Sequence, residues 1–300
     1  MIKVLKTNMQ VLLLGLIILS GCKEIPPFID FTEKVDGLKD TTYIGTAPTA
    51  VLKAIYIEDL TGVRCNNCPK AADKIKEIHT ANPGVPFVAM GVYPYALSNL
   101  TAPYPGEDTL NTGVADDIFN NVYNSPSAIP TGGVNRKLFA GETSLNISYN
   151  KWSGNADVVK VEESPIVLTA QLVSYDDVTR KARILTKITF SKKYDASLNL
   201  SLYLTESKII SKQTMPNGSL NDTYEHNHAL RKAITPYNGT PLKINTSTVG
   251  LYEAGRVFEK EFEVSIDSKW FKDNCSIVIL VNRFDASSKE VMQATEVELK

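Results

Sequence analysis

The chain has 300 residues, of which 43% are hydrophobic and 22% charged, and its formal net charge is −1. This length supplies enough apolar surface for one or two folded domains. The lack of a basic excess argues against a nucleic-acid partner. The sequence contains one long apolar run, at the N-terminus, which argues against a helical membrane protein and favours a tethered soluble body.

The N-terminal segment has the pattern of a bacterial secretion signal. Lys3 and Lys6 precede an apolar run over residues 11–19 that is too short to cross a membrane. The next residues, Ser-Gly-Cys, end at Cys22 and, with the preceding leucine, resemble the lipobox, in which the cysteine is lipidated and becomes the first mature residue. The alternative is an ordinary cleaved signal peptide with a chance cysteine. We predict a lipoprotein signal peptide over residues 1–21.

The residues after Cys22 indicate where the anchored protein lies. Lys23 occupies the second mature position, where inner-membrane lipoproteins tend to carry aspartate. The resemblance therefore implies an outer-membrane lipoprotein that faces the periplasm or the cell surface and contacts the membrane through the lipid on Cys22. Residues 22–44, which include Pro26 and Pro27, are expected to form a poorly ordered tether.

A β-α-β unit is predicted around two closely spaced cysteines. Residues 50–60 form an apolar, β-branched run typical of a buried strand, and residues 85–93 form a second one. Between them lies VRCNNCPKA, in which Pro69 suits the first turn of a helix. The cysteine pair thus falls at the turn from strand to helix, where the helix dipole and the neighbouring Arg64 favour a thiolate at Cys65.

The cysteine count limits the chemistry of this pair. With Cys22 assigned to the lipid, Cys65, Cys68 and Cys275 remain. Structural zinc sites need four ligands, commonly two such pairs or one pair with two histidines, whereas this sequence has one pair and distant histidines. We therefore predict a disulfide or dithiol at Cys65 and Cys68, no metal or other cofactor, and a buried Cys275 at the start of a strand.

Four residues, in their order along the chain, resemble the thioredoxin fold. A strand followed by Cys-x-x-Cys at the start of a helix is the first part of the likeness. Asp59 stands six residues before Cys65, where thioredoxins carry a buried acid that exchanges a proton with the resolving cysteine. Pro130, in SAIPTGGVNRK, matches the proline that follows a cis peptide bond and packs against the dithiol. The resemblance implies a thioredoxin-like domain over residues 45–155, with Cys65, Cys68, Asp59 and Pro130 as candidate redox site.

The segment also departs from the thioredoxin pattern. Arg64 stands where a tryptophan is usual, and Asn66-Asn67 replaces the common central dipeptides. A Pro/Gly/Tyr-rich loop over residues 93–113 and a short helix over residues 114–124 lengthen the path to Pro130. A comparable insertion occurs in periplasmic thioredoxin-like proteins of the TlpA type. These departures leave the redox potential and the choice of partner open.

The two cysteines are expected to differ in reactivity. Cys65 stands at the N-terminus of the predicted helix, so we expect it to be the more exposed and more acidic thiol. Cys68 lies about one helical turn further in and is expected to be covered by its helix. The alternative is a buried structural disulfide in which neither sulfur is reachable.

The second half of the chain changes to strand periodicity. Alternating or apolar β-rich runs recur with turn signals between them, over residues 165–175, 181–190, 198–206, 223–231, 256–265, 275–284 and 290–299. About seven strands is the number found in an immunoglobulin-like sandwich. The predicted fold is an α/β thioredoxin-like domain followed by an all-β immunoglobulin-like sandwich domain over residues 163–300.

The whole arrangement resembles one bacterial family. A lipoprotein signal, the segment EDLTGVRCNNCPKA and a β-rich half that carries TYEHNHALR are similar to the Bacteroidetes outer-membrane proteins named for an apparent mass of twenty-eight kilodaltons. The resemblance covers nearly all of the mature chain. It implies an outer-membrane or surface location and leaves the biochemical activity open.

The stretch EHNH contains His226 and His228. In a strand these two side chains share a face with Tyr224. Two histidines at this spacing could hold a metal if a third ligand, such as Glu206 or Asp222, joined them. The alternative is a half-buried, hydrogen-bonded pair near the junction of the two domains.

Two classes of function remain. In the first, the protein is an interaction or structural module: a thioredoxin-like scaffold with a structural disulfide, and a sandwich that binds a partner protein or glycan. In the second, it is a membrane-tethered thiol–disulfide oxidoreductase, in which Cys65 attacks, Cys68 resolves, Asp59 moves the proton and Pro130 positions the substrate. The fold does not decide between them. The outer-membrane position, which offers no evident electron source, and the missing aromatic residue before Cys65 favour the first class.

Overall fold

The computed structural model describes residues 37–245 and 250–300. The predicted signal peptide, Cys22 and the first part of the predicted tether lie outside the described residues. Residues from Leu38 to Lys300 belong to one unit. In the described part of the chain, no helix is both long and apolar enough to span a membrane.

The described residues are mainly β-strand with a few short helices. The helices are α2 (Cys68–Ala81), α3 (Ser98–Thr101), α4 (Gly113–Asn121) and α5 (Trp152–Val159). The strands of the first half are β1 (Asp40–Ile44), β2 (Val51–Leu52), β3 (Ile55–Leu60), β4 (Phe87–Val92), β5 (Thr131–Val134) and β6 (Glu163–Ser164). The remaining strands are β7 (Ile166–Asp176), β8 (Lys181–Phe190), β9 (Asn199–Glu206), β10 (Ile209–Thr214), β11 (Leu220–His226), β12 (Ala229–Ala233), β13 (Thr240–Pro241), β14 (Arg256–Ser265), β15 (Cys275–Asn282) and β16 (Val291–Glu298). The seven strands expected in the second half are all present, with β11 and β12 at the stretch around residues 223–231.

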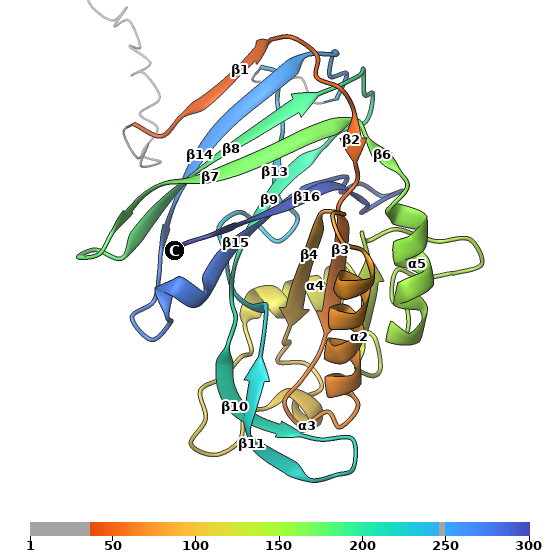
Figure 1. Ribbon diagram of the computed structural model, residues 1–300, viewed down its shortest axis with the longest axis vertical. Helices are drawn as coiled ribbons and strands as arrows, with labels where there is room; N and C mark the ends of the chain where they lie inside the picture. Colours follow the sequence, from red (N-terminus) through yellow and green to blue (C-terminus); the bar gives the residue numbers. More distant parts are fainter. Residues whose placement is uncertain (1–36, 246–249) are drawn as a thin grey trace, which may run out of the picture. The chain divides into compact units, whose positions relative to one another are not determined.

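The predicted β-α-β unit is confirmed. Strands β3 and β4 pair in parallel, from Ile55 opposite Phe87 onwards, and α2 connects them. Proline occupies the first turn of α2, where the missing N–H leaves no hydrogen bond unmade. Strand β5 then pairs antiparallel to the other side of β3. The cysteine pair therefore lies at the carboxyl end of β3 and the start of α2 (Figure 1).

One sheet contains strands from both halves of the chain. Its order is β16-β15-β9-β12-β4-β3-β5, with β13 paired to β9. The halves meet where β12 pairs in parallel with β4, Ala229 opposite Gly91, and the Gly91 N–H donates to the His228 carbonyl at 2.8 Å. The strands expected in a separate second domain thus continue the sheet that β3 and β4 begin.

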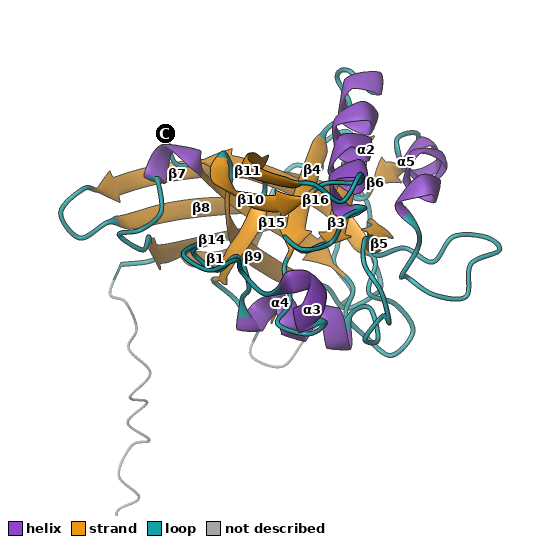
Figure 2. Ribbon diagram, turned by 90° about the horizontal axis from the view of Figure 1, so that it is seen from below, coloured by secondary structure: helices purple, strands orange, loops and turns teal. Residues whose placement is uncertain are grey.

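Both faces of this sheet are covered. On the β3–β5 part, Ile55 and Ile57 pack in one apolar cluster with residues of α2 and α5, whereas Tyr56 belongs to the cluster that contains residues of α4. Figure 2 shows these helices on opposite sides of the strands. On the β9–β15 part, one face packs against a second, four-stranded sheet, β1-β14-β8-β7, across a core that includes Leu202 and Ile188.

The predicted tether is too long at its C-terminal end. Residues Asp40–Ile44 form β1, which pairs antiparallel with β14 over its whole length. The Thr42 hydroxyl donates to the Val257 carbonyl at 2.8 Å, and the Tyr43 hydroxyl donates to Glu259. The sequence DTTYI has no buried face of its own, so its strand character comes from the free edge of β14.

Strands β10 and β11 form a hairpin that belongs to neither large sheet. They pair only with each other in the described part of the chain, as a two-stranded sheet. In Figure 1 the hairpin extends from the end of β9 towards the loop that carries α3. It connects β9 to β12 and brings a segment of the second half next to the cysteine pair.

Candidate functional site

Cys65 and Cys68 form a disulfide. Each residue is 2% exposed, so the expectation that Cys65 is the more accessible of the two is wrong for this structure. The reason is that the helix is not the only cover over the pair. Two segments far away in the sequence, the loop around α3 and the β10–β11 hairpin, also lie against the loop that contains Cys65.

The loop around α3 covers one side of the disulfide loop. The backbone N–H of Arg64 donates to the Leu100 carbonyl at 2.9 Å. The backbone of Gly62 lies so close to the same carbonyl that a Cβ on this residue would be 2.4 Å from the Leu100 oxygen. The Arg64 guanidinium lies 4.4 Å from the centre of the Tyr104 ring and donates to the carbonyls of Ala102 and Pro103. Arg64 therefore holds this loop in place, and its charge is directed to the loop instead of towards Cys65 as the sequence had suggested.

The β10–β11 hairpin covers another side. Gln213 is 2% exposed, and its side-chain N–H donates to the Cys65 carbonyl at 2.9 Å and to the Thr214 carbonyl at 3.0 Å. The Thr214 N–H donates to the Val63 carbonyl at 2.9 Å. The hairpin is thus hydrogen-bonded to the backbone of the disulfide loop by both a side chain and its main chain.

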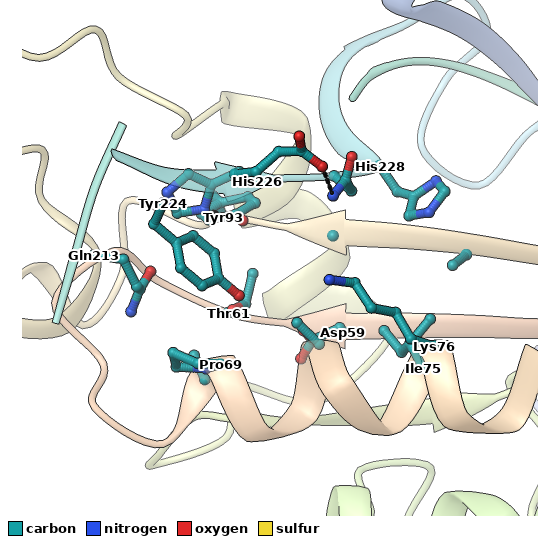
Figure 3. Close-up of a pocket in the computed structure, with 16 residues that line it drawn as sticks. Asp59, Thr61, Pro69, Ile75, Lys76, Tyr93, Gln213, Tyr224, His226 and His228 are labelled. Atoms are coloured by element: carbon teal, nitrogen blue, oxygen red, sulfur yellow. Dashed lines mark hydrogen bonds between the residues drawn. The ribbon is translucent and has the colours of Figure 1, made fainter. Parts of the chain in front are cut away.

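Asp59 and Cys68 line the same small pocket of about 90 Å³. Figure 3 shows this pocket between α2 and the base of the hairpin, with Tyr224 directed into it. Asp59 is 3% exposed, and Oδ1 of its carboxyl has no hydrogen-bond partner. Burial raises its pKa to about 8, so the carboxyl keeps its proton at neutral pH. A neutral acid beside Cys68 can give a proton to a thiolate.

The neighbour of Asp59 on β4 is Gly91, and this glycine leaves the acid without a counter-charge on that strand. The next inward side chain is Tyr93, whose hydroxyl lies 3.2 Å from Nδ1 of His226. Burial lowers the pKa of His226 to about 4, so the ring is neutral at neutral pH. Asp59 and His226 are therefore both neutral near pH 7, whereas Lys76 and Glu225 are the ionised groups that line the pocket.

His226 and His228 do not share one strand face. His228 has φ of 55°, which breaks the strand between β11 and β12. The possible third ligand Glu206 is bound elsewhere: its Oε2 accepts from Nε of Arg231 at 2.8 Å, and its Oε1 accepts from the Phe271 N–H. Over residues 37–245 and 250–300, no cluster of three His, Cys, Asp or Glu side chains is placed to hold a metal ion.

The peptide bond between Ile129 and Pro130 is cis, as predicted. Pro130 is half-buried and directly precedes β5, where Thr131 pairs with Leu60 at the end of β3. Ile129 belongs to the same buried cluster as both cysteines. The sheet thus brings the segment of Pro130 to the end at which the disulfide lies.

A buried ion pair was missed by the sequence reasoning. Arg136 binds Glu58 through Nε at 2.8 Å, and the hydroxyls of Tyr56 and Tyr123 each donate to the same carboxylate at 2.7 Å. Burial alone would raise the pKa of Glu58, but Arg136 and the two hydroxyls outweigh it and hold the pKa below its ordinary value. The acidic pair Glu58–Asp59 at the end of a buried strand was the available signal, because adjacent strand residues point to opposite faces.

Gln213 was also missed, and no local pattern marks it. It lies 148 residues after Cys65, in a stretch that reads as an ordinary polar strand. Gln213 reaches Cys65 only because the hairpin follows β9 directly and extends from the end of that strand to the disulfide loop.

The described residues define a mixed α/β protein, mostly strand, with a buried disulfide at a helix start and a neutral buried acid that shares a pocket with one of its cysteines. A family model described as outer membrane protein Omp28 matches residues 116–300, which is more than half of the chain. The chain therefore belongs to the Omp28 family of outer membrane proteins, as the sequence resemblance had implied. The matched residues begin after the disulfide, so membership rests on α4 and the β-rich part.

One solved structure supports the fold. HBP35 of Porphyromonas gingivalis matches with a TM-score of 0.61 and 16% sequence identity, over 86% of this chain and 77% of that chain. At this identity the likeness shows the mixed, mostly β fold alone. No curated protein matches the sequence. The family supports a location at the outer membrane.

Proposed function

We propose that this protein is an outer-membrane lipoprotein, anchored through Cys22, whose role is structural or in partner binding. Residues 45–155 form its thioredoxin-like part and residues 163–300 its immunoglobulin-like sandwich part, which binds a partner protein or glycan. Support for the first part comes from the β-α-β unit with a disulfide at the helix start and from β5, which follows Pro130. Two sheets that face each other across one apolar core support the second.

The main support for a structural role is the burial of both cysteines of the disulfide. Cys65 and Cys68 are each 2% exposed. The hairpin and the α3 loop are both hydrogen-bonded to the loop that joins β3 to the cysteine pair. Exchange catalysts need a sulfur that a partner thiolate can attack in line with the disulfide bond. The closed arrangement instead suits a staple within a scaffold.

A second candidate function is thiol–disulfide exchange, and Asp59 is the observation that favours it. Its carboxyl is buried, has an unpartnered oxygen, and shares a pocket with Cys68. A raised pKa caused by burial at such a place is a common property of catalytic groups. In this function the reduced Cys65 attacks a substrate disulfide and Cys68 resolves the mixed disulfide. In the reverse direction Cys65 is attacked and Cys68 leaves. In both directions Asp59 moves the proton and Pro130 helps to hold the substrate.

The reduction potential of the Cys65–Cys68 disulfide separates the two candidates. The protein is equilibrated with dithiothreitol at graded ratios of reduced to oxidised reagent, and the two cysteines are quantified by alkylation and mass spectrometry. A structural disulfide is expected below about −300 mV, and exchange catalysts lie between about −120 and −270 mV. A potential in the second range would contradict the structural role and support exchange.

A further inference from the structure

We propose that the β10–β11 hairpin is a latch that controls whether a dithiol can reach the Cys65–Cys68 disulfide, and that Gln213 is the residue that holds it shut. The inference rests on the second candidate function, because it describes how an exchange site that is closed in this structure becomes accessible. The dithiol is a partner protein with two reduced cysteines, which acts as the reductant.

The hairpin is attached to the rest of the protein by few buried groups. Of its strand residues, only Ser211, Gln213 and His226 are buried, and the others are half-buried or exposed. Ser211 donates to a carboxylate oxygen of Glu107 at 2.9 Å, and the hydroxyls of Tyr104 and Thr214 lie 2.5 Å apart. The other contacts are the Tyr93–His226 contact, the ion pair of Lys212 with Glu107, and the packing of Ile209 against a small apolar cluster that is separate from the two large cores. The hairpin can therefore separate without disturbing the large cores.

The two ends of the hairpin have the backbone geometry of hinges. Lys208, before β10, has φ of 56°, and His228, after β11, has φ of 55°. Both are non-glycine residues in the left-handed region, where only a few per cent of such residues are found. A change of φ at these two positions would move the hairpin as one body, and domain and loop closures commonly use such end positions.

The ends remain fixed to the sheet while the hairpin moves. The His228 N–H donates to the Ser207 hydroxyl at 2.9 Å, and the His228 carbonyl accepts from Gly91. The Lys208 N–H donates to the side chain of Asn227 at 3.0 Å. None of these bonds joins the hairpin tip to the disulfide loop, because they link the two ends of the hairpin to each other and to the sheet. β9 and β12 therefore keep their pairing when the hairpin opens.

Gln213 is the contact that joins the hairpin to the disulfide itself. Its amide spans the gap to the Cys65 carbonyl and also lines the pocket that contains Asp59 and Cys68. Opening therefore removes the cover over the disulfide and over the proton source together. In the reaction, a thiolate of the dithiol attacks Sγ of Cys65, the disulfide bond breaks, and Cys68 leaves as a thiolate that takes the Asp59 proton. The second thiol then displaces Cys65 as the dithiol closes to a disulfide, and its proton passes to the Cys65 thiolate. The proton that the attacking thiol released on ionising returns to Asp59 through solvent, so the cysteine pair gains two electrons and two protons in total.

The test measures reduction of the full-length protein by dithiothreitol alongside hydrogen exchange. Gln213→Ala is expected to raise the rate constant of reduction about tenfold, the factor that corresponds to about 1.4 kcal/mol for one buried hydrogen bond. Exchange of the Thr214 amide, which is bonded to Val63, should accelerate with it, whereas the amide of Ile279 in β15, a strand paired on both sides, should not. Gln171→Ala, on an exposed position of β7, is the matched control and should leave both rates unchanged.

Two results would overturn the latch. One is an unchanged rate of reduction in Gln213→Ala although the Thr214 amide exchanges faster. The other is equal acceleration at Thr214 and Ile279, which would mean that reduction follows global unfolding. If Gln213→Ala does not fold, Tyr104→Phe removes the hydroxyl bound to Thr214 and is expected to act in the same direction. The reduction potential is a separate measurement: a value in the range of structural disulfides together with accelerated reduction would keep the latch and reject the exchange function.

Discussion

Replacing Asp59 with asparagine should stabilise the protein, and the gain should grow with pH. The carboxyl has an ordinary pKa of 3.8 in the unfolded chain and a pKa of about 8 when it is buried in the fold. Between these values the folded protein holds a proton that the unfolded chain has lost. The stability that this proton contributes is complete below pH 4 and is lost progressively as the pH rises from 4 to 8. Asparagine has no such proton to lose.

The size of the effect follows from the same two values. At about 1.36 kcal/mol per pH unit above 3.8, keeping Asp59 protonated costs at most about 1.6 kcal/mol at pH 5 and about 4.4 kcal/mol at pH 7. The stabilisation by Asp59→Asn should therefore be larger at pH 7 than at pH 5, by up to about 3 kcal/mol. Other titrating groups, including His226, are present in both proteins and cancel in the comparison.

The assay is urea unfolding of both proteins with the disulfide intact, at pH 5 and pH 7, followed by tryptophan fluorescence. Trp152 is fully buried between α5 and the sheet and reports loss of the fold. Asp117→Asn, at an exposed position of α4, serves as the matched control and should show no such trend. A stability difference between Asp59→Asn and the parent that is the same at both pH values would refute the assignment of a buried, neutral carboxyl.

The remaining predictions concern packing, a buried charge and the anchor. Gly62→Ala should destabilise by about 1–3 kcal/mol, because the added Cβ meets the carbonyl of the α3 loop, whereas Gly154→Ala in α5, where the Cβ meets nothing, should not lower the melting temperature. Arg136→Met should lower the free energy of unfolding in urea by about 3–5 kcal/mol, since it leaves the Glu58 carboxylate buried without its charged partner. Adding Glu58→Gln should recover most of this loss, and no recovery would mean that the loss comes from packing. Cys22→Ala should release the protein from the membrane fraction, and retention of that variant would reject the lipid anchor.

Much of the secondary structure could be predicted because its signals are local. The β-α-β unit around the cysteines follows from two apolar runs and Pro69, and the strands of the second half follow from alternation of apolar and polar residues. The cysteine pair was likewise found from its place between the strand and the helix, and Asp59 was singled out by the resemblance to the thioredoxin fold. The sequence also placed Pro130 in the correct loop before β5.

What could not be predicted depends on pairings between distant segments. β1 is a strand because β14 offers a free edge, and its short, mostly exposed sequence shows no alternation of apolar and polar residues. The cover over Cys65 comes from Gln213, whose neighbours give no sign of the contact. The continuous sheet was missed for a similar reason: β12 joins β4 through one pair of residues, Ala229 and Gly91, and alternation within a strand does not name its neighbour.

The position of the hairpin in the chain has a consequence for maturation. A secreted polypeptide emerges with its N-terminus first, so the cysteines, three residues apart, leave the export channel well before Gln213, which follows Cys65 by 148 residues. If the chain is exported as proposed, the pair is open to the oxidants of the periplasm during that interval. Unless the hairpin later opens, oxidation must precede docking of β10 and β11. A chain whose cysteines are still reduced when its second half folds would then keep them reduced and hidden, as a trapped product that retains its native secondary structure.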